Sequence, residues 1–131
     1  MTFGAGPRKN LGHPYNRRHP VAAIFRYFER KLRHRLGQPW TRRFWGNRAI
    51  TIFPDSSESM WLFYNVMLDW PEFPFLASYL CPDDTVIDVG ANIGIYSLWM
   101  SRFLGPNATL IAFEPSGECF ARLSGLMSQN A

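Results

Sequence analysis

Two short segments carry the residues whose types and spacing could do chemistry. An apolar run that ends at Val89 contains one acid, Asp88, and leads into a turn with two glycines, Gly90 and Gly94. A second apolar run ends in another acid, Glu114, 24 residues after Gly90. Acids and glycines that follow buried strands are typical of a nucleotide-type cofactor site at the carboxyl edge of a parallel sheet. The pattern predicts such a site here.

The composition of the turn narrows the class of ligand. The pattern Asp-x-Gly-x-Asn-x-Gly is neither a P-loop nor the Gly-x-Gly-x-x-Gly dinucleotide motif, and the turn has no Lys or Arg to neutralise phosphate. The different glycine pattern and the missing basic residue disfavour ATP as the ligand and, more weakly, NAD. Gly90 lets a ligand approach closely, and we expect amides of the turn to face a polar ligand group. Glu114 could accept hydrogen bonds from ribose hydroxyls, whereas Asp88 suits a positively charged group.

The apolar periodicity predicts the elements that hold these residues. We expect strands over 85–89 and 108–113, a helix over 93–104, and a second helix that begins at Gly117 with Ser116 as its cap. This strand–helix–strand–helix order predicts an α/β fold with parallel strands joined by right-handed crossovers. Because Val86-Ile87 and Leu110–Phe113 are apolar throughout, we expect the two strands to be buried on both faces.

The part of the chain before this segment is expected to form a basic leader. Residues 1–20 are rich in Gly, Pro, Asn and Arg, which predicts a flexible arm, and residues 21–70 are expected to form helices and a hairpin. A helix is predicted over 21–36, and a hairpin within 41–53. The apolar residues of the first helix fall on one stripe at spacings of three and four: Ile24, Phe25, Phe28, Leu32 and Leu36.

Charge is divided unevenly along the chain. Residues 1–48 contain 12 Lys and Arg and a single acid, whereas residues 49–131 contain two Arg and nine acids. The basic segment could bind nucleic acid or an anionic membrane. A solvated basic face that docks on the acidic part of the protein is favoured over both.

The sequence also indicates the cellular compartment and argues against a bound metal. No apolar run reaches the length of about 18–20 residues that spans a bilayer, and residues 1–20 lack the apolar core of a signal peptide. Cys81 and Cys119 form no CxxC pair, which argues against zinc or a disulfide scaffold. We expect a cytoplasmic protein with two free, buried thiols and no metal.

The motif Val86–Gly94 together with Ala112–Pro115 resembles the FkbM family of S-adenosylmethionine-dependent methyltransferases. The ending 128–131, Ser-Gln-Asn-Ala, is also similar to that family. The resemblance implies that residues 71–131 are the N-terminal part of an FkbM-type methyltransferase domain. Its fold would then be an incomplete Rossmann-like class I methyltransferase sheet containing the first two β-α units.

The resemblance also implies a cofactor, a reaction and a set of site residues. The cofactor would be S-adenosyl-L-methionine, and the methyl acceptor an oxygen of a small molecule or sugar. The turn would line the methionine end of the cofactor, Glu114 would hold the ribose and Pro115 would shape the adenine side. The expected cofactor-binding residues are Asp88, Gly90, Ala91, Asn92, Gly94, Glu114 and Pro115.

No residue is identified as a catalytic base, although the acids Asp69 and Glu72 precede the motif. Because family members continue past this segment, the chain alone is expected to be inactive, and its exposed sheet edge could self-associate. Two rival functions are a fragment of an NAD-binding oxidoreductase and a non-catalytic basic module that binds nucleic acid or anionic membrane through residues 1–48.

Overall fold

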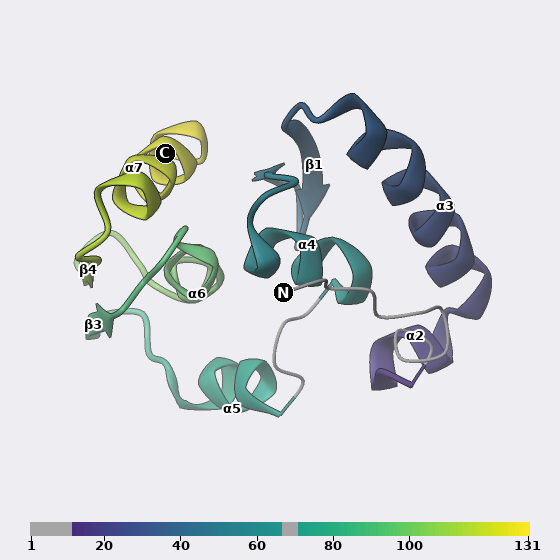
Figure 1. Ribbon diagram of the computed structural model, residues 1–131. Coiled ribbons are helices and arrows are strands. Elements are labelled where there is room, and N and C mark those ends of the chain that lie inside the picture. The colour runs from purple at the N-terminus through teal and green to yellow at the C-terminus, as the bar shows by residue number, and fades with distance from the viewer. Residues whose placement is uncertain (1–11, 67–70) are drawn as a thin grey trace. The chain divides into compact units, whose positions relative to one another are not determined.

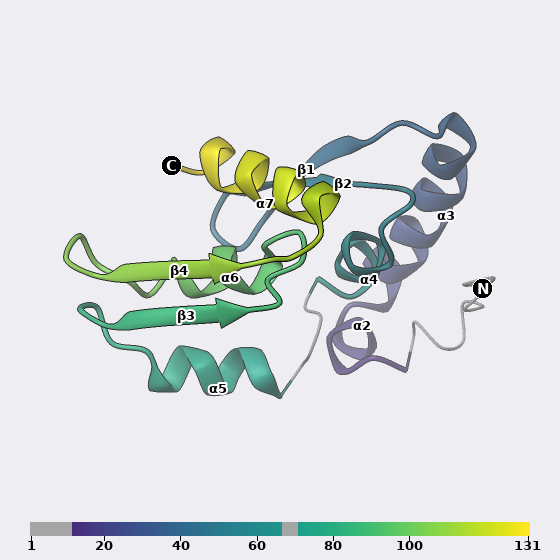
Figure 2. The same cartoon turned by 60° about the vertical axis from the view of Figure 1, so that its left-hand side comes forward.

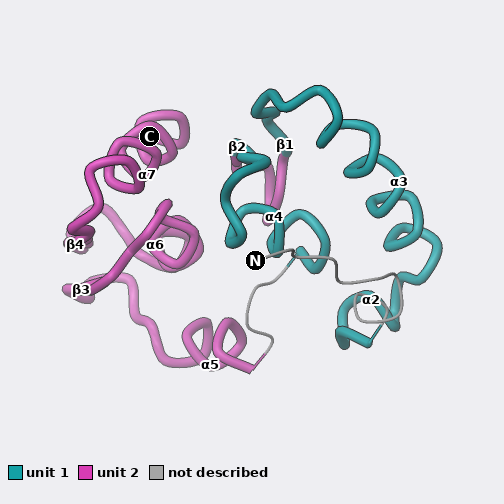
Figure 3. Tube along the Cα trace, viewed as in Figure 1, with its two compact units in different colours: residues 1–42, 51–70 teal, residues 43–50, 71–131 magenta. Residues whose placement is uncertain are grey.

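The computed structural model describes residues 12–66 and 71–131, and Figure 1 shows its helices and strands. The chain divides into two compact units (Figure 3). Unit 1 comprises 1–42 and 51–70, and unit 2 comprises 43–50 and 71–131. The elements, in chain order, are α2 (Pro14–Arg18), α3 (Pro20–Leu36), β1 (Trp40–Phe44), β2 (Arg48–Ile52), α4 (Ser57–Asn65), α5 (Glu72–Tyr79), β3 (Thr85–Val89), α6 (Ile95–Met100), β4 (Thr109–Phe113) and α7 (Gly117–Gln129).

A buried polar network joins the three helices of unit 1. Asn16 on α2 donates from Nδ2 to Oδ1 of Asn65 on α4 at 2.9 Å, and its own Oδ1 accepts from Nη2 of Arg26 at 2.7 Å. The Nε of Arg26 on α3 donates to the carbonyl of Tyr64 at 3.0 Å. Asn16, Arg26 and Asn65 are all buried, so these hydrogen bonds replace bonds to water, whereas Nδ2 of Asn65 is buried without a partner among the described residues. Burial lowers the pKa of Arg26 below its ordinary value, as expected for a cation removed from water.

The beginning of unit 1 differs from the expected flexible arm over residues 1–20. Residues 14–18 form α2, with Pro14 in the first turn and His13 Nδ1 accepting from the amide of Tyr15 at 3.3 Å. The expectation of a flexible arm is wrong for residues 14–18, because Asn16 is hydrogen-bonded to residues that lie far away in the sequence. Residues 1–11 lie outside the described part of the chain.

Helix α3 confirms the helix predicted over 21–36. Its buried residues are Ala23 and Arg26, whereas the apolar stripe is exposed to solvent. The basic face is not simply solvated, because Arg26, Arg30 and Arg33 contact acceptors or an aromatic ring within unit 1. Arg30 lies over the ring of Tyr64 at 5.1 Å, and Arg33 Nε donates to Glu29 at 2.9 Å. Gly37 ends the helix in the left-handed conformation.

The predicted hairpin is confirmed as the two-stranded sheet of β1 and β2. Its turn consists of Trp45, Gly46 and Asn47, with φ values of 42°, 71° and 84°. Gly46 meets the need for positive φ without strain, and asparagine tolerates that region better than most residues.

The predicted α/β pattern and parallel pairing are confirmed in unit 2. Strands β3 and β4 pair in parallel, with Thr85 opposite Thr109 and Val89 opposite Phe113. Figures 1 and 2 show α6 and α7 on the same side of this pair. Ser116 caps α7 as expected, accepting at Oγ from the amide of Cys119.

The expectation that both faces of the strands are buried is wrong. Alternate residues along β3 and β4 point to the face opposite the one on which α6 and α7 lie. The apolar side chains exposed on this bare face are Ile87, Val89, Ile111 and Phe113.

Segment 43–50 is attached to the rest of unit 2 at both of its ends. The ring of Trp45 lies 4.9 Å from the ring of Trp99 on α6. At the other end, the side-chain amide of Asn130 accepts from the amide of Ala49 and donates to its carbonyl, both at 2.8 Å. This amide clip mimics a pair of strand hydrogen bonds. The division into a 21–70 leader and a 71–131 domain stays a prediction.

The two cysteines are free, but neither is buried. Cys81 is exposed in the loop after α5, and Cys119 is partly exposed in the first turn of α7. The expectation of buried thiols is therefore wrong.

Removing the guanidinium of Arg26 should destabilise unit 1. Arg26→Ala leaves Asn16 Oδ1 and the Tyr64 carbonyl without their buried donor, and each unsatisfied group costs about 1–3 kcal/mol. We expect a fall of that order in the free energy of unfolding, measured by urea denaturation of the full chain. Arg35→Ala, on the exposed part of the same helix, is the control and should change stability by less than about 0.5 kcal/mol. Equal effects of the two substitutions would contradict the network.

Candidate functional site

The parallel register brings the two sequence motifs together at one edge of the sheet. Val89 pairs with Phe113, so the turn after β3 and the loop after β4 leave the sheet side by side. The carbonyl of Phe113 accepts from the amides of Gly90 at 2.9 Å and Ala91 at 3.0 Å. This carbonyl fixes where the turn begins relative to Glu114.

The carboxylate of Glu114 then ties the two loops together. Its Oε2 accepts from the amide of Asn92 in the turn, and its Oε1 accepts from the amide of Ser116 at the start of α7, both at 2.8 Å. A carboxylate has about four lone-pair positions, so each oxygen can still accept from a ligand hydroxyl. The half-buried Glu114 is thus held in a fixed position at the sheet edge.

The backbone amides of the turn are used within the protein. Besides those of Gly90, Ala91 and Asn92, the amide of Gly94 donates to the carbonyl of Ala91 at 2.8 Å. The expectation that turn amides face a ligand is therefore wrong for these four residues. The physical reason is that the carbonyls of Phe113 and Ala91 and the carboxylate of Glu114 already accept from these amides. What the edge presents is mainly acceptors and negative charge.

Asp88 lies on the helix-covered side of β3. Its Oδ2 accepts from Oγ of Ser97 at 2.6 Å, and Ser97 is a buried residue of α6. The hydroxyl orients the carboxylate, which is partly exposed next to the turn. Sequence reasoning did not single out Ser97, although a serine within the apolar helix pattern was a signal that could have identified it.

The two glycines of the turn have similar backbones but different surroundings. Gly90 has φ 83°, and a Cβ added there would meet nothing within 4 Å. Gly94 has φ 87°, but a Cβ there would lie 3.1 Å from Cγ of Leu123 on α7. Gly90 therefore leaves open space at the sheet edge, whereas Gly94 allows the turn to pack against α7.

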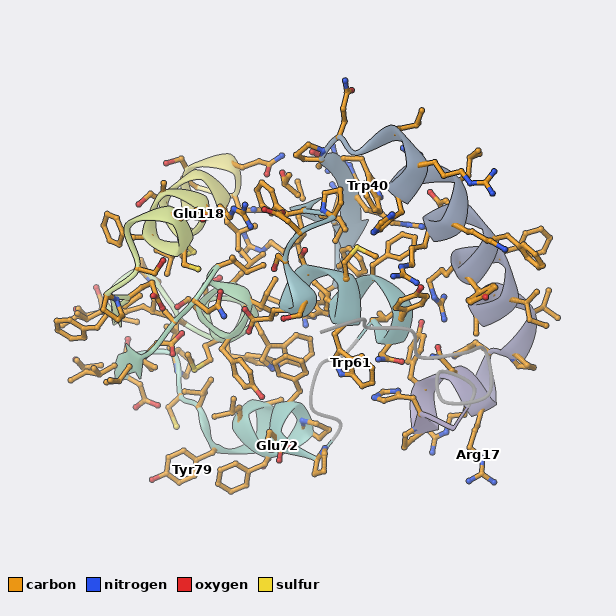
Figure 4. The ribbon with its side chains drawn as sticks, in the orientation of Figure 1. Arg17, Trp40, Trp61, Glu72, Tyr79 and Glu118 are labelled. Carbon is orange, nitrogen blue, oxygen red and sulfur yellow. The ribbon has the colours of Figure 1, made fainter. Side chains whose placement is uncertain are left out.

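Asn92 and Pro115, two further expected cofactor-binding residues, lie on the two loops of the sheet edge. Asn92 adopts a positive φ of 50°, and Pro115 is exposed beyond Glu114. Glu72 lies exposed in the first turn of α5, and Figure 4 labels it there. Asp69 lies outside the described residues.

A separate hollow in unit 2 contains none of the expected cofactor residues. It measures about 680 Å³ and is lined by three arginines, Arg43, Arg48 and Arg102, together with Asn130 and neighbouring residues. Burial and the nearby Arg48 lower the pKa of Arg102. No sequence signal predicted this grouping, because the arginines come from the hairpin and from the turn after α6. The hollow lacks the acids and glycines of the sheet edge. We therefore place the candidate site at that edge.

The described residues offer neither a metal site nor a helix that could span a membrane. Within 12–66 and 71–131, no three His, Cys, Asp or Glu side chains gather as a metal site requires. Among the helices of the same residues, none combines the length and the apolar character needed to cross a bilayer.

Comparison with known proteins gives two partial matches. A stretch of 45 residues is 44% identical to "Methyltransferase sdnD" of Sordaria araneosa, covering 34% of this chain and 17% of that protein. A stretch of 52 residues is 42% identical to "AMB antimetabolite synthetase AmbE" of Pseudomonas aeruginosa, covering 40% of this chain and 2% of that protein. The chain thus matches less than a fifth of the length of either relative. No family model matches the chain, and no solved structure matches it.

The surroundings of Gly94 give a testable difference between two glycines. Gly94→Ala forces a Cβ against Leu123 at a positive φ, which should lower the free energy of unfolding by about 1–3 kcal/mol. The matched control is Gly125→Ala, which lies within α7 and meets nothing within 4 Å. It should raise stability by about 0.5–1 kcal/mol through helix propensity. Thermal unfolding of both variants measures the difference, and a stable Gly94→Ala protein would refute the packing role.

Proposed function

We propose that the chain is the cofactor-binding part of a methyltransferase of the FkbM kind. It would use S-adenosyl-L-methionine and transfer the methyl group to an oxygen of a small molecule or sugar. The observation that carries the proposal is the sheet edge where Glu114 ties the Gly90–Gly94 turn to the start of α7. The 45-residue likeness to a protein named as a methyltransferase supports methyl transfer in general.

The chemistry of the edge fits this cofactor. S-adenosylmethionine carries positive charge on its sulfonium and its ammonium groups, and its ribose carries two hydroxyl donors. The edge offers the carboxylates of Asp88 and Glu114, and the loops around them contain no Lys or Arg between residues 83 and 101 or 103 and 121. Open space at Gly90 leaves room for a ligand to lie against the backbone.

Each side chain would have a separate part in holding the cofactor. Asp88, oriented by Ser97, would attract the positively charged methionine end, and Glu114 would accept from the ribose hydroxyls with its remaining lone pairs. Pro115 would shape the adenine side, and Ala91, Asn92 and Gly94 would fix the shape of the turn. The bound cofactor supplies an electrophilic methyl group on sulfur. The protein's contribution is to hold donor and acceptor in line at close range.

The bare face of the sheet supports the view that this chain forms only part of the catalytic unit. Parallel sheets are normally covered on both faces, yet Ile87, Val89, Ile111 and Phe113 are exposed. We infer that further protein covers this face and supplies the acceptor site and the base. Residues 1–131 alone would then lack turnover, and the open sheet edge would favour self-association. A cytoplasmic location accompanies this proposal.

The geometry disfavours the oxidoreductase alternative. A dinucleotide site uses turn amides and a helix N-terminus to bind pyrophosphate. Here the amides of Gly90, Ala91, Asn92 and Gly94 already donate within the protein, and two carboxylates lie nearby. A dianionic pyrophosphate would be repelled, whereas a sulfonium would be attracted.

The open space at Gly90 can be tested with a matched pair of glycine variants. Gly90→Ala and Gly46→Ala both place a Cβ at positive φ with nothing within 4 Å, so both carry a similar backbone cost of roughly 1–2 kcal/mol. Only Gly90→Ala should weaken binding of S-adenosylhomocysteine, by about tenfold or more, in calorimetric titration of the full chain. An equal loss in Gly46→Ala would show that the effect comes from general destabilisation. Unchanged affinity in Gly90→Ala would move the ligand away from the turn.

The role of Glu114 can be tested by keeping its shape and removing its charge. Glu114→Gln replaces an acceptor oxygen with an NH₂ group that cannot accept from either an amide or a ribose hydroxyl. A hydrogen bond to a charged group is worth about 1.5–3 kcal/mol, so affinity for S-adenosylhomocysteine should fall about tenfold or more. Glu118→Gln, an exposed acid of the same helix start that pairs with Arg122, is the control and should bind normally. Tighter binding of NAD than of S-adenosylhomocysteine by the unaltered chain would reject the cofactor assignment.

A further inference from the structure

Helix α3 exposes a continuous apolar stripe on the surface of unit 1. Its members recur at spacings of three and four residues over the full length of the helix, and each has 47–71% of its surface exposed. They are Val21, Ile24, Phe25, Phe28, Leu32 and Leu36. Contiguous apolar patches of this kind are uncommon on proteins that do not use them for contact.

The stripe is not the surface by which α3 packs within unit 1. That packing uses the opposite side, where Ala23 and Arg26 are buried and Arg26 bonds to Asn16 and the Tyr64 carbonyl. Figure 4 shows side chains that project from α3 on the side away from α4. Because the inner face already has its polar partners, unit 1 cannot bury the stripe by turning the helix without breaking them.

The charges beside the stripe indicate the chemistry of its partner. Lys31 follows Phe28 by three residues and Arg35 follows Leu32 by three, so both lie next to the stripe on the helix surface. Both are exposed, and so is Arg17 at the end of α2, which Figure 4 shows extending away from the ribbon. The described part of unit 1 contains eight Lys and Arg and three acids. The described part of unit 2 contains four Lys and Arg and six acids. Positive charge thus accompanies the apolar surface.

We propose that α3 docks unit 1 on an anionic lipid surface, lying in the plane of the bilayer interface. The stripe would enter the boundary between headgroups and acyl chains, and Lys31, Arg35 and Arg17 would contact acidic headgroups. An amphipathic helix with aromatic and aliphatic side chains on one face and basic residues beside it has the properties of interfacial helices. Nucleic acid fits less well, because Arg26, Arg30 and Arg33 are engaged within unit 1 and the outward face is mainly apolar.

The test measures binding of the full chain to vesicles by co-sedimentation. Vesicles of phosphatidylcholine mixed with phosphatidylglycerol are compared with vesicles of phosphatidylcholine alone. The chain should bind the mixed vesicles and should bind the neutral ones at least tenfold more weakly, since each basic residue near an anionic surface contributes a severalfold gain. Raising the salt concentration should weaken the binding without abolishing it, because the apolar contribution persists.

Matched variants separate the stripe from apolar surface in general. Phe25→Ser with Phe28→Ser removes two exposed rings and should weaken vesicle binding by about a hundredfold. Phe75→Ser removes a similarly exposed ring from α5, where no basic residue lies within the helix, and should leave binding unchanged. Because all three positions are exposed, the variants should remain folded, which circular dichroism verifies. Lys31→Ala with Arg35→Ala should reduce binding to the mixed vesicles and leave residual binding to neutral ones as it was.

Several outcomes would overturn the proposal. These are equal binding to neutral and mixed vesicles, the absence of vesicle binding, and an equal loss on Phe75→Ser. A dimer that dissociates in the Phe25→Ser, Phe28→Ser variant, together with no vesicle binding, would assign the stripe to a second copy of the chain. Binding of S-adenosylhomocysteine is measured separately, so either proposal can fail without the other.

Discussion

The in-register parallel pairing of β3 with β4 is the constraint on which the candidate site depends. The pairing places the Phe113 carbonyl where it accepts from Gly90 and Ala91, and this in turn brings the Asn92 amide to Glu114. A slip of one residue would turn the side chains of one strand to the opposite face and separate these partners. Because this geometry uses the turn amides within the protein, the edge presents acceptors and negative charge. The backbone thus contributes to this character together with the acidic side chains.

Sequence reasoning succeeded where local signals agreed with the fold. The strand at Thr85–Val89 was bounded correctly because a short apolar run lies between Asp84 and a glycine turn. The cap at Ser116 was identified for a similar local reason. The use of the amides of Gly90, Ala91 and Asn92 could not be predicted, because their acceptors lie at the end of another strand and in the loop after it. The bare sheet face was also missed, since apolar strand residues look the same whether or not a helix covers them.

Helix α3 shows a second limit of prediction from the sequence. Periodicity gave its length and its stripe, but the side that packs inward is decided by Arg26, whose partners are 10 and 38 residues away in the sequence. A buried arginine that satisfies its donors can compete with apolar side chains for the inner face, because its stem is apolar and its head bonds to carbonyl and amide oxygens. The hydrophobic pattern alone contains no information about those acceptors.

The amide clip between Asn130 and Ala49 has a consequence for how the protein is made. It joins residues 81 apart, and segment 43–50 belongs to a unit whose remaining residues begin at Pro71. During synthesis Ala49 emerges well before Asn130, so the clip cannot form until residue 130 has left the ribosome. Translation proceeds at about 5–20 residues per second, which leaves Ala49 without this partner for roughly 4–16 s. The order of synthesis thus makes the closure of unit 2 a late, long-range step in which the two ends of a discontinuous sequence must meet.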